Sequence, residues 1–243
     1  LMNIEDVGFF SAAYQLANFL GLASSAVTAL VFPLMVSYRT EGQSGKISYF
    51  INGLVPQFLI CWNLLLATCA FAAQLLIPIF VSQAFVNSIL PFQVLTLGLS
   101  FSAIGCTLNG VTNAHDLIKY DAAVNAAGGT IKVIVGLILI VHLGIVGAAI
   151  ATVVAYALTH QTYIYLVNNK LGMKRRIRLY ALNLATLIPL FTVILCQMKL
   201  HLSLLSLLFL VQIGGVVLIV RKLRLFDRTL IELVERAGLP SGL

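Results

Sequence analysis

Long apolar runs separated by short polar segments make up most of this chain. A helix needs about 20 residues to cross the hydrocarbon core of a bilayer. Seven runs are long enough, namely Val7–Tyr38, Ile47–Val81, Ile89–Thr112, Ala122–Val141, Ile145–Val167, Leu179–Gln197 and Leu202–Val220. The pattern predicts an all-α fold, a polytopic membrane bundle of seven transmembrane helices. At ~1.5 Å per residue the first two runs exceed the thickness of the core, so we expect them to tilt, bend or protrude.

The composition agrees with a membrane protein. Hydrophobic residues make up 60% of the chain and charged residues only 9%, whereas a soluble domain carries about 25% charged residues. The net charge of +7 lies mainly in the short segments between apolar runs, where the loops of a membrane protein are found. We therefore do not expect nucleic acid as a partner.

Lysine and arginine are distributed unevenly over these segments. Thirteen of the 15 fall in alternate segments, one lies inside the fourth run, and the other set of segments holds only Lys199. The basic set comprises Arg39 with Lys46, then Lys119, then the segment 170–178, then the tail 221–236. Basic loops stay on the cytoplasmic side, so this distribution predicts an external N-terminus and a cytoplasmic C-terminus.

The tail has an amphipathic pattern of its own. Over 225–237, leucine, isoleucine, phenylalanine and valine alternate with acidic and basic residues. Such a helix suits the membrane interface, and a surface for a cytoplasmic partner is the alternative.

The fourth run carries polar residues on one face. Their spacing of four, three and four residues is that of Asp121, Asn125, Gly128 and Lys132. Lys132 lies eleven residues from Asp121, or ~16 Å along the axis, near the bilayer midplane. A charge at that depth is costly unless it meets water or a partner. Either Lys132 lines an aqueous cavity and meets an anionic substrate, or it pairs with helix carbonyls or with an acid outside this sequence.

Two further runs carry polar stripes. In the first run the stripe is Ser11, Tyr14, Asn18, Gly21, Ser25 and Thr28. It suits a transport pathway or a packing seam of small residues, although packing explains Tyr14 and Asn18 less well. In the fifth run the stripe is Thr152, Tyr156, Thr159 and Tyr163. The candidate cavity residues are therefore Lys132, Asn125, Tyr14, Asn18 and Tyr156.

Other polar residues are expected at helix ends. We expect His160 to be a polar residue near the cytoplasmic end of its helix rather than a proton carrier. We expect a solvated end for the third helix, with gating as the weaker alternative, at Asn109, Asn113, His115 and Asp116.

Signatures of catalysis are absent from the sequence. The four cysteines lie inside apolar runs without a CxxC pair or a Cys/His cluster, so we expect small packing residues rather than metal ligands or disulfides. Nucleotide-binding, HExxH and GxSxG motifs are missing as well. We expect neither an enzyme nor a metal or cofactor site.

In the opening stretch an acidic segment precedes Val7-Gly8-Phe9-Phe10-Ser11, and the helix ends near Pro33. This stretch resembles a late helix of the polysaccharide transporters, a branch of the multidrug, oligosaccharidyl-lipid and polysaccharide exporters. The stretch 142–156 resembles the turn between two helices of that family, with Gly144 and Gly147 in place. The resemblance covers about residues 5–160 and the last two runs only by position.

The resemblance implies two helical lobes around a central cavity, with this chain as the C-terminal half. Residues 1–168 are then a partial second lobe of five transmembrane helices, 169–220 two additional helices, and 221–243 a cytoplasmic amphipathic tail. The implied function is a flippase for undecaprenyl-pyrophosphate-linked oligosaccharide in the cytoplasmic (inner) membrane, where Lys132 suits the pyrophosphate. The implied partners are the lipid-linked glycan, membrane lipid, the N-terminal half of the same transporter and the polysaccharide polymerase machinery.

Three other functions stay open at this point. They are a lipid II flippase, a multidrug/cation antiporter of the same superfamily, and a membrane scaffold that does not transport. The antiporters often place an acidic residue in a helix of the second lobe, and none lies at mid-span here. A scaffold has little need of polar stripes or of Lys132.

Overall fold

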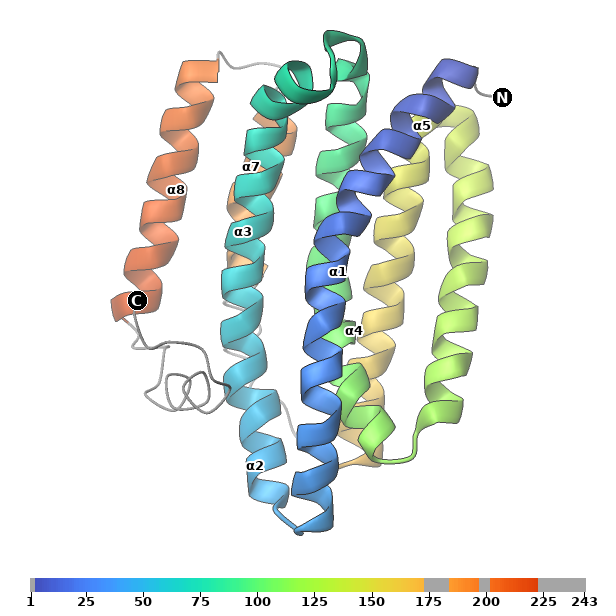
Figure 1. Ribbon diagram of the computed structural model, residues 1–243, viewed down its shortest axis with the longest axis vertical. Helices are drawn as coiled ribbons and strands as arrows, with labels where there is room; N and C mark the ends of the chain where they lie inside the picture. The colour runs from blue at the N-terminus through green and yellow to red at the C-terminus, as the bar shows by residue number, and fades with distance from the viewer. Residues whose placement is uncertain (1–2, 173–183, 197–201, 223–243) are drawn as a thin grey trace.

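The computed structural model describes residues 3–172, 184–196 and 202–222, which form a bundle of long helices joined by short turns (Figure 1). In chain order these elements are α1 (Ile4–Thr40), α2 (Ser44–Tyr49), the π-helical turn η1 (Phe50–Leu54), α3 (Val55–Leu76), the π-helical turn η2 (Ile77–Val81), the 3₁₀ helix η3 (Gln83–Ser88), α4 (Ile89–Ala114), α5 (Ile118–Lys170), α7 (Ile188–Cys196) and α8 (Leu202–Lys222). The predicted all-α membrane helix bundle is confirmed at this level.

Four stretches are long and apolar enough to cross a membrane. They are α1, the nearly continuous rod Ser44–Val81, the segment Gln83–Ala114 and α5. The rod contains both π-helical turns, and each lies beside a proline, Pro56 or Pro78. A proline has no amide hydrogen for the helical ladder, so a widened turn is the expected local response. The sixth predicted run is described only in part, and the predicted tail helix over 225–237 lies outside the described residues.

The 53-residue helix α5 is a hairpin of two antiparallel arms (Figure 1). The backbone leaves the helical region at Gly144, with φ of 56° and ψ of −135°, a conformation that favours glycine. Across the hairpin, Gly128 lies against Thr159 and Gly136 against Ala151. A methyl group at Gly147 would overlap the Leu139 carbonyl, so the two arms are already in close contact one turn beyond the bend. The predicted turn at Gly144 is confirmed, and the fourth and fifth predicted runs are the two arms.

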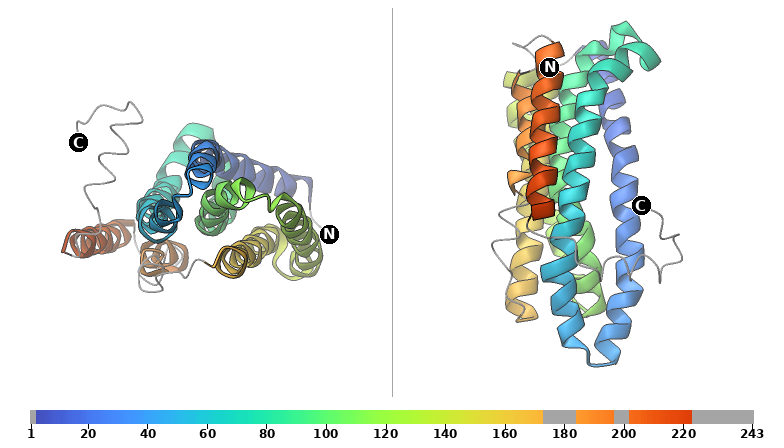
Figure 2. Two further views of the ribbon diagram at one scale, coloured as in Figure 1. Left: turned by 90° about the horizontal axis from the view of Figure 1, so that it is seen from below. Right: turned by 90° about the vertical axis from the view of Figure 1, so that its left-hand side faces the viewer.

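Helix α4 lies at the centre of the bundle, in contact with α1, α3 and both arms of α5 (Figure 2). In an apolar stretch of 18 residues within Gln83–Ala114, 67% of the residues are buried, against 17% in stretches of the same length in α1 and in α5. The outer helices therefore turn most of their apolar side chains away from the protein. Leu137 and Ile138 on α5 are examples, each more than half exposed. Such outward apolar surface is expected where lipid covers the fold.

Helices α7 and α8 form a separate layer beside α3. α7 packs on α3, and α8 packs on α7. Their contacts make a second small apolar core, in which the rings of Phe71 and Phe209 stack with centroids 4.7 Å apart. Asn63 donates a hydrogen bond of 2.8 Å to Thr186 at the edge of this layer. The layer lies outside the main core that α4 organises.

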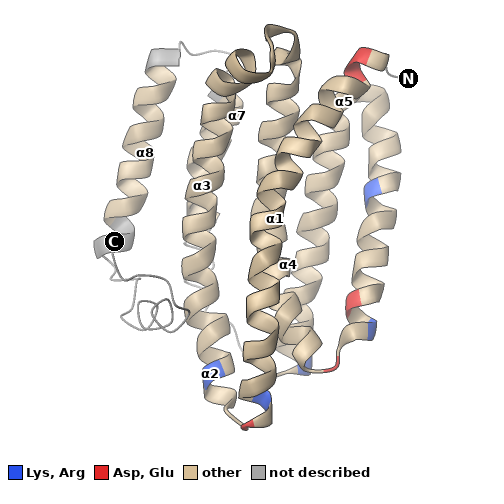
Figure 3. Cartoon of the chain, in the orientation of Figure 1, with Lys and Arg blue, Asp and Glu red and all other residues tan. Residues whose placement is uncertain are grey.

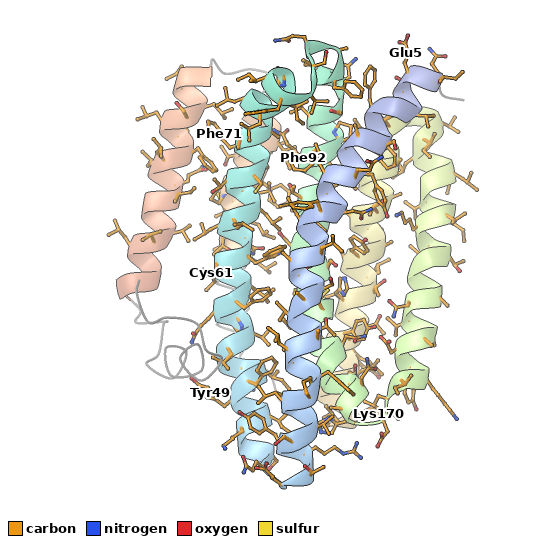
Figure 4. The ribbon with its side chains drawn as sticks, in the orientation of Figure 1. Glu5, Tyr49, Cys61, Phe71, Phe92 and Lys170 are labelled. Carbon is orange, nitrogen blue, oxygen red and sulfur yellow. The ribbon has the colours of Figure 1, made fainter. Side chains whose placement is uncertain are left out.

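Most charged residues of the described chain lie at the two ends of the bundle, and one basic residue lies part-way along the first arm of α5 (Figure 3). At one end Arg39 forms an ion pair of 2.7 Å with Asp116 and donates to the Ala114 carbonyl at 2.6 Å, which joins the end of α1 to the loop between α4 and α5. Lys170 lies at the same end, over the ring of Tyr120. Glu5 lies at the opposite end (Figure 4). Arg39, Lys119 and Lys170 thus share one end, as the alternation of basic segments predicts.

Candidate functional site: a polar cavity beside Lys132

A cavity of about 360 Å³ lies between α1, α4 and the two arms of α5. Its polar lining includes Asn109, Asn125, Lys132, Tyr156, His160 and Tyr163. Three of the five predicted cavity residues, Lys132, Asn125 and Tyr156, therefore line one cavity. The other two come from α1, and each adjoins this cavity in a different way.

Tyr14 lies beneath the ammonium group of Lys132. The Lys132 nitrogen is 5.0 Å from the centroid of the Tyr14 ring, a cation–π contact that stabilises a cation by about 0.5–2 kcal/mol. Within the described residues no carboxylate forms an ion pair with Lys132. The Tyr14 ring thus attracts the ammonium group of Lys132, but it carries no negative charge that would neutralise it.

Asn18 lines a neighbouring cavity of about 570 Å³. The two cavities share lining residues Ser102, Cys106 and Tyr156, so the Tyr156 ring stands between the Lys132 side and the Asn18 side. The two predicted cavity residues of α1, Tyr14 and Asn18, therefore adjoin the same polar region of the bundle.

The α1 stripe also includes a packing seam. Thr28 donates a hydrogen bond of 2.7 Å to the Cys106 carbonyl, and Gly21 lies against the Leu99 side chain. Ser24, which is not part of the predicted stripe, is almost fully buried beside Cys106. The two interpretations of the stripe thus overlap: Gly21 and Thr28 pack against α4 and also line a cavity, whereas Asn18 and Ser25 line the second cavity.

One end of the cavity is closed by a hydrogen-bond network around Asp121. Its Oδ1 atom accepts from Asn109 at 2.6 Å, from Asn125 at 3.1 Å and from the Tyr163 hydroxyl. Asn113 in turn donates to Asn109 at 2.8 Å. The network joins α4 to both arms of α5 through the Oδ1 atom of Asp121. The expectation that Asn109 belongs to a solvated helix end is therefore wrong, because α5 folds over that part of α4.

His160 is also placed differently from the sequence expectation. Its side chain is only 8% exposed and lies against Gly105 of α4, where a methyl group would overlap the imidazole. The second arm of α5 continues for ten residues beyond it, to Lys170. His160 is thus a wall residue of the cavity, and the end-of-helix interpretation is wrong. Gly105 in the middle of an apolar run was the available signal, because such a glycine often marks a close approach.

Aromatic rings line the second arm beside this histidine. The ring centroids of Tyr156 and His160 are 5.9 Å apart, and those of His160 and Tyr163 are 6.0 Å apart in a stacked arrangement. Within the described residues no group of three or more His, Cys, Asp or Glu side chains is arranged to hold a metal ion. The cavity therefore offers one ammonium group, amides, hydroxyls and aromatic faces.

Comparison with known proteins gives a distant relative among membrane proteins. No protein-family model matches the chain, and no solved structure matches it. The uncharacterized membrane protein MJ1068 of Methanocaldococcus jannaschii is 27% identical over 167 residues, which are 66% of this chain and 32% of the relative. The chain therefore matches about a third of the length of that protein, which is about 520 residues long (167 divided by 0.32). The similarity to this membrane protein and the long apolar helices of the structure both indicate a multi-pass membrane protein.

Proposed function

We propose that this chain is the second half of a flippase that moves an undecaprenyl-pyrophosphate-linked oligosaccharide across the cytoplasmic membrane for polysaccharide biosynthesis. The observation that carries the proposal is Lys132, which lines a polar cavity of a membrane bundle and has no carboxylate partner within the described residues. In this proposal its ammonium group contacts the pyrophosphate. Seven spans, an external N-terminus and a cytoplasmic C-terminus belong to the same proposal.

The energetics favour an anion beside Lys132. A lysine at the centre of a membrane helix costs about 2.5–3.5 kcal/mol on insertion scales. The contact with Tyr14 returns about 0.5–2 kcal/mol, which leaves part of the cost. A bound phosphate or pyrophosphate supplies the missing negative charge, since lysine binds phosphate as a point charge. Asp121 is a poor substitute because it does not line the cavity and forms no ion pair with Lys132 within the described residues.

The chemistry of the neighbouring walls suits a sugar. Asn18, Gln15 and Ser25 line the second cavity and Tyr156 separates it from Lys132. Amides and hydroxyls hydrogen-bond sugar hydroxyls, and an aromatic face packs on the apolar face of a pyranose ring. An anionic group at Lys132 would therefore have space for an attached sugar on the other side of Tyr156.

The arrangement of the helices supports a two-lobe transporter. The main core holds α1 to α5, and α7 with α8 packs outside it, as expected for a partial lobe with two additional helices. A relative about 520 residues long has room for a second lobe. In the proposed mechanism the two lobes rock around the cavity, so that Lys132 meets the substrate first from the cytoplasmic side and then from the outside.

The test is glycan export in a flippase-deleted bacterial host that carries the whole transporter. Lys132→Gln should reach the membrane in normal amounts and lose export, because it removes the positive charge. Lys132→Arg should keep part of the activity, because it retains the charge in a different shape. Lys119→Gln is the matched control, since Lys119 is exposed at the end of the same arm.

Two results would overturn the proposal. Wild-type export by Lys132→Gln would show that Lys132 does not contact the substrate. Loss of the Lys132→Gln protein from the membrane, with normal amounts of Lys119→Gln, would show instead that the lysine is structural.

A further inference from the structure

We infer that His160 is a second ligand for the anionic group of the transported molecule, placed on the opposite arm of α5 from Lys132. This inference rests on the proposed function, because it assumes that an anion occupies the cavity. It goes beyond that function by assigning a binding role to a residue whose sequence position suggests only a helix end.

The burial of His160 is the first observation. The side chain is 8% exposed, and within the described residues neither ring nitrogen has a hydrogen-bond partner. Imidazole nitrogens are strong donors or acceptors, and a buried polar group without a partner is destabilising. Most buried polar groups in proteins do have partners, so each exception calls for an explanation. Here the imidazole forms part of the lining of the same cavity as Lys132.

The orientation of the ring is the second observation. An added methyl group at Gly105 would overlap Nδ1 and Cε1 of His160, so this edge of the ring faces α4. Tyr156 and Tyr163 lie on either side of the imidazole. Both aromatic neighbours restrict the ring, and the absence of a side chain at Gly105 makes room for it. A side chain held in this way is prepared to bind a ligand at low entropic cost.

The register of the hairpin determines how far Lys132 and His160 are offset along the helix axis. Gly128 lies against Thr159 and Gly136 against Ala151, so Lys132 is level with Ala155. His160 is five residues further along its arm, or ~7.5 Å along the axis. Each hydrogen bond adds about 3 Å between heavy atoms. A diphosphate is therefore long enough to contact the ammonium of Lys132 at one end and the imidazole at the other.

The charges around His160 favour an anion over a cation. The ionisable side chains nearby are Tyr14 on α1, Cys106 on α4, Lys132 and Asp121 on the first arm, and Tyr156 and Tyr163 on the second. Asp121 does not line the cavity, and its Oδ1 atom accepts from Asn109, Asn125 and Tyr163. Lys132 is thus the charged side chain in the lining of the cavity. A neutral imidazole donates one hydrogen bond to a phosphate oxygen, and an imidazolium would add a second positive charge.

The experiment measures binding of a soluble probe to the purified whole transporter in phosphatidylcholine nanodiscs. The probe is uridine diphosphate N-acetylglucosamine, which joins a diphosphate to a sugar, and uridine is the control ligand. We expect wild-type protein to bind the probe and not uridine. His160→Ala and Lys132→Gln should each weaken binding by about tenfold or more, the effect of losing one good hydrogen bond or charge. His160→Gln should lose less, because its amide also donates, and His142→Ala, at an exposed histidine, should bind as wild type.

Nuclear magnetic resonance of ring-labelled histidine separates contact from a structural role. The signal that disappears in His160→Gln is assigned to His160, and in wild-type protein it should shift when the probe is added and stay unchanged with uridine. This readout does not depend on whether the His160→Ala protein folds.

The outcomes distinguish the two proposals. Binding that depends on Lys132, with an unshifted His160 signal and wild-type affinity in both His160 variants, overturns the role of His160 and leaves the anion site at Lys132. Wild-type protein that does not bind the probe overturns the anion site itself, and with it the role of His160.

Discussion

The network around Asp121 should stabilise the junction between α4 and the α5 hairpin by a measurable amount. Tyr163→Phe removes one of the three donors to Oδ1 and leaves the packing of the ring unchanged. Tyr163 is 2% exposed, so water cannot replace the lost hydroxyl without disturbing the packing. The substitution therefore tests the hydrogen bond with little change in shape.

The expected loss of stability in Tyr163→Phe follows from the free energies of side-chain hydrogen bonds measured in membrane proteins and in soluble proteins. Side-chain hydrogen bonds between membrane helices average about 0.6 kcal/mol and reach about 1.7 kcal/mol, whereas bonds to charged groups in soluble proteins contribute about 1.5–3 kcal/mol. The acceptor here is a carboxylate, which favours the upper part of the membrane range. It is also shared with Asn109 and Asn125 and is partly exposed, which lowers the net value. We expect Tyr163→Phe to lower the free energy of unfolding by about 1.5 kcal/mol.

The assay is unfolding by sodium dodecyl sulfate in mixed micelles, applied as a double-mutant cycle with Tyr163→Phe and Asp121→Ala. Tyr165→Phe is the matched control, because Tyr165 is 63% exposed on the same arm. We expect a coupling energy of about 1–1.5 kcal/mol between Tyr163 and Asp121, and no change in the control. A coupling energy below about 0.5 kcal/mol would refute the argument, because the hydroxyl and the carboxylate would then act independently.

The remaining predictions concern the α5 hairpin and the topology. Gly147→Ala should destabilise the protein by about 1–3 kcal/mol because its methyl group would overlap the Leu139 carbonyl, whereas Gly8→Ala, with open space around it, should be neutral in the same unfolding assay. A Gly147→Ala protein as stable as wild type would contradict the close approach of the arms. In a cysteine-free background, Asn87→Cys should react with an impermeant thiol reagent in intact cells and Met173→Cys should not, since the basic segment 170–178 is proposed to be cytoplasmic. Labelling of Met173→Cys would reverse the proposed topology.

The sequence predicted the face that Lys132 shares with Asn125 because helical periodicity alone determines which residues line one side of a helix. It predicted a break between the fourth and fifth apolar runs because the runs end at Val141 and begin again at Ile145, and the family resemblance placed Gly144 in that turn. Neither prediction needed to know which helices are neighbours. The packing of the polar stripe on α1 does depend on a neighbouring helix, so only the structure shows that α4 contacts Gly21 and Thr28.

The errors at His160 and Asn109 have a different cause. Both residues lie near the predicted limit of an apolar run, where polarity suggests solvent. Their contacts depend on a neighbour that is distant in sequence: α4 presents Gly105 to His160, and α5 brings Asp121 to Asn109. The contact between Tyr14 and Lys132 likewise joins residues more than one hundred positions apart. One-dimensional periodicity contains no information about such pairs.

The α5 hairpin also bears on how the chain enters the membrane. On insertion scales Lys132 costs about 2.5–3.5 kcal/mol, and each isoleucine, leucine or valine returns about 0.3–0.6 kcal/mol. Nine such residues lie between Ile131 and Val141, which together return about 2.7–5.4 kcal/mol. The first arm is therefore close to the threshold for insertion when it leaves the ribosome by itself. Once the second arm has emerged, Tyr163 can donate a hydrogen bond to Asp121, so we expect the two arms to be more stable in lipid together than the first arm is by itself.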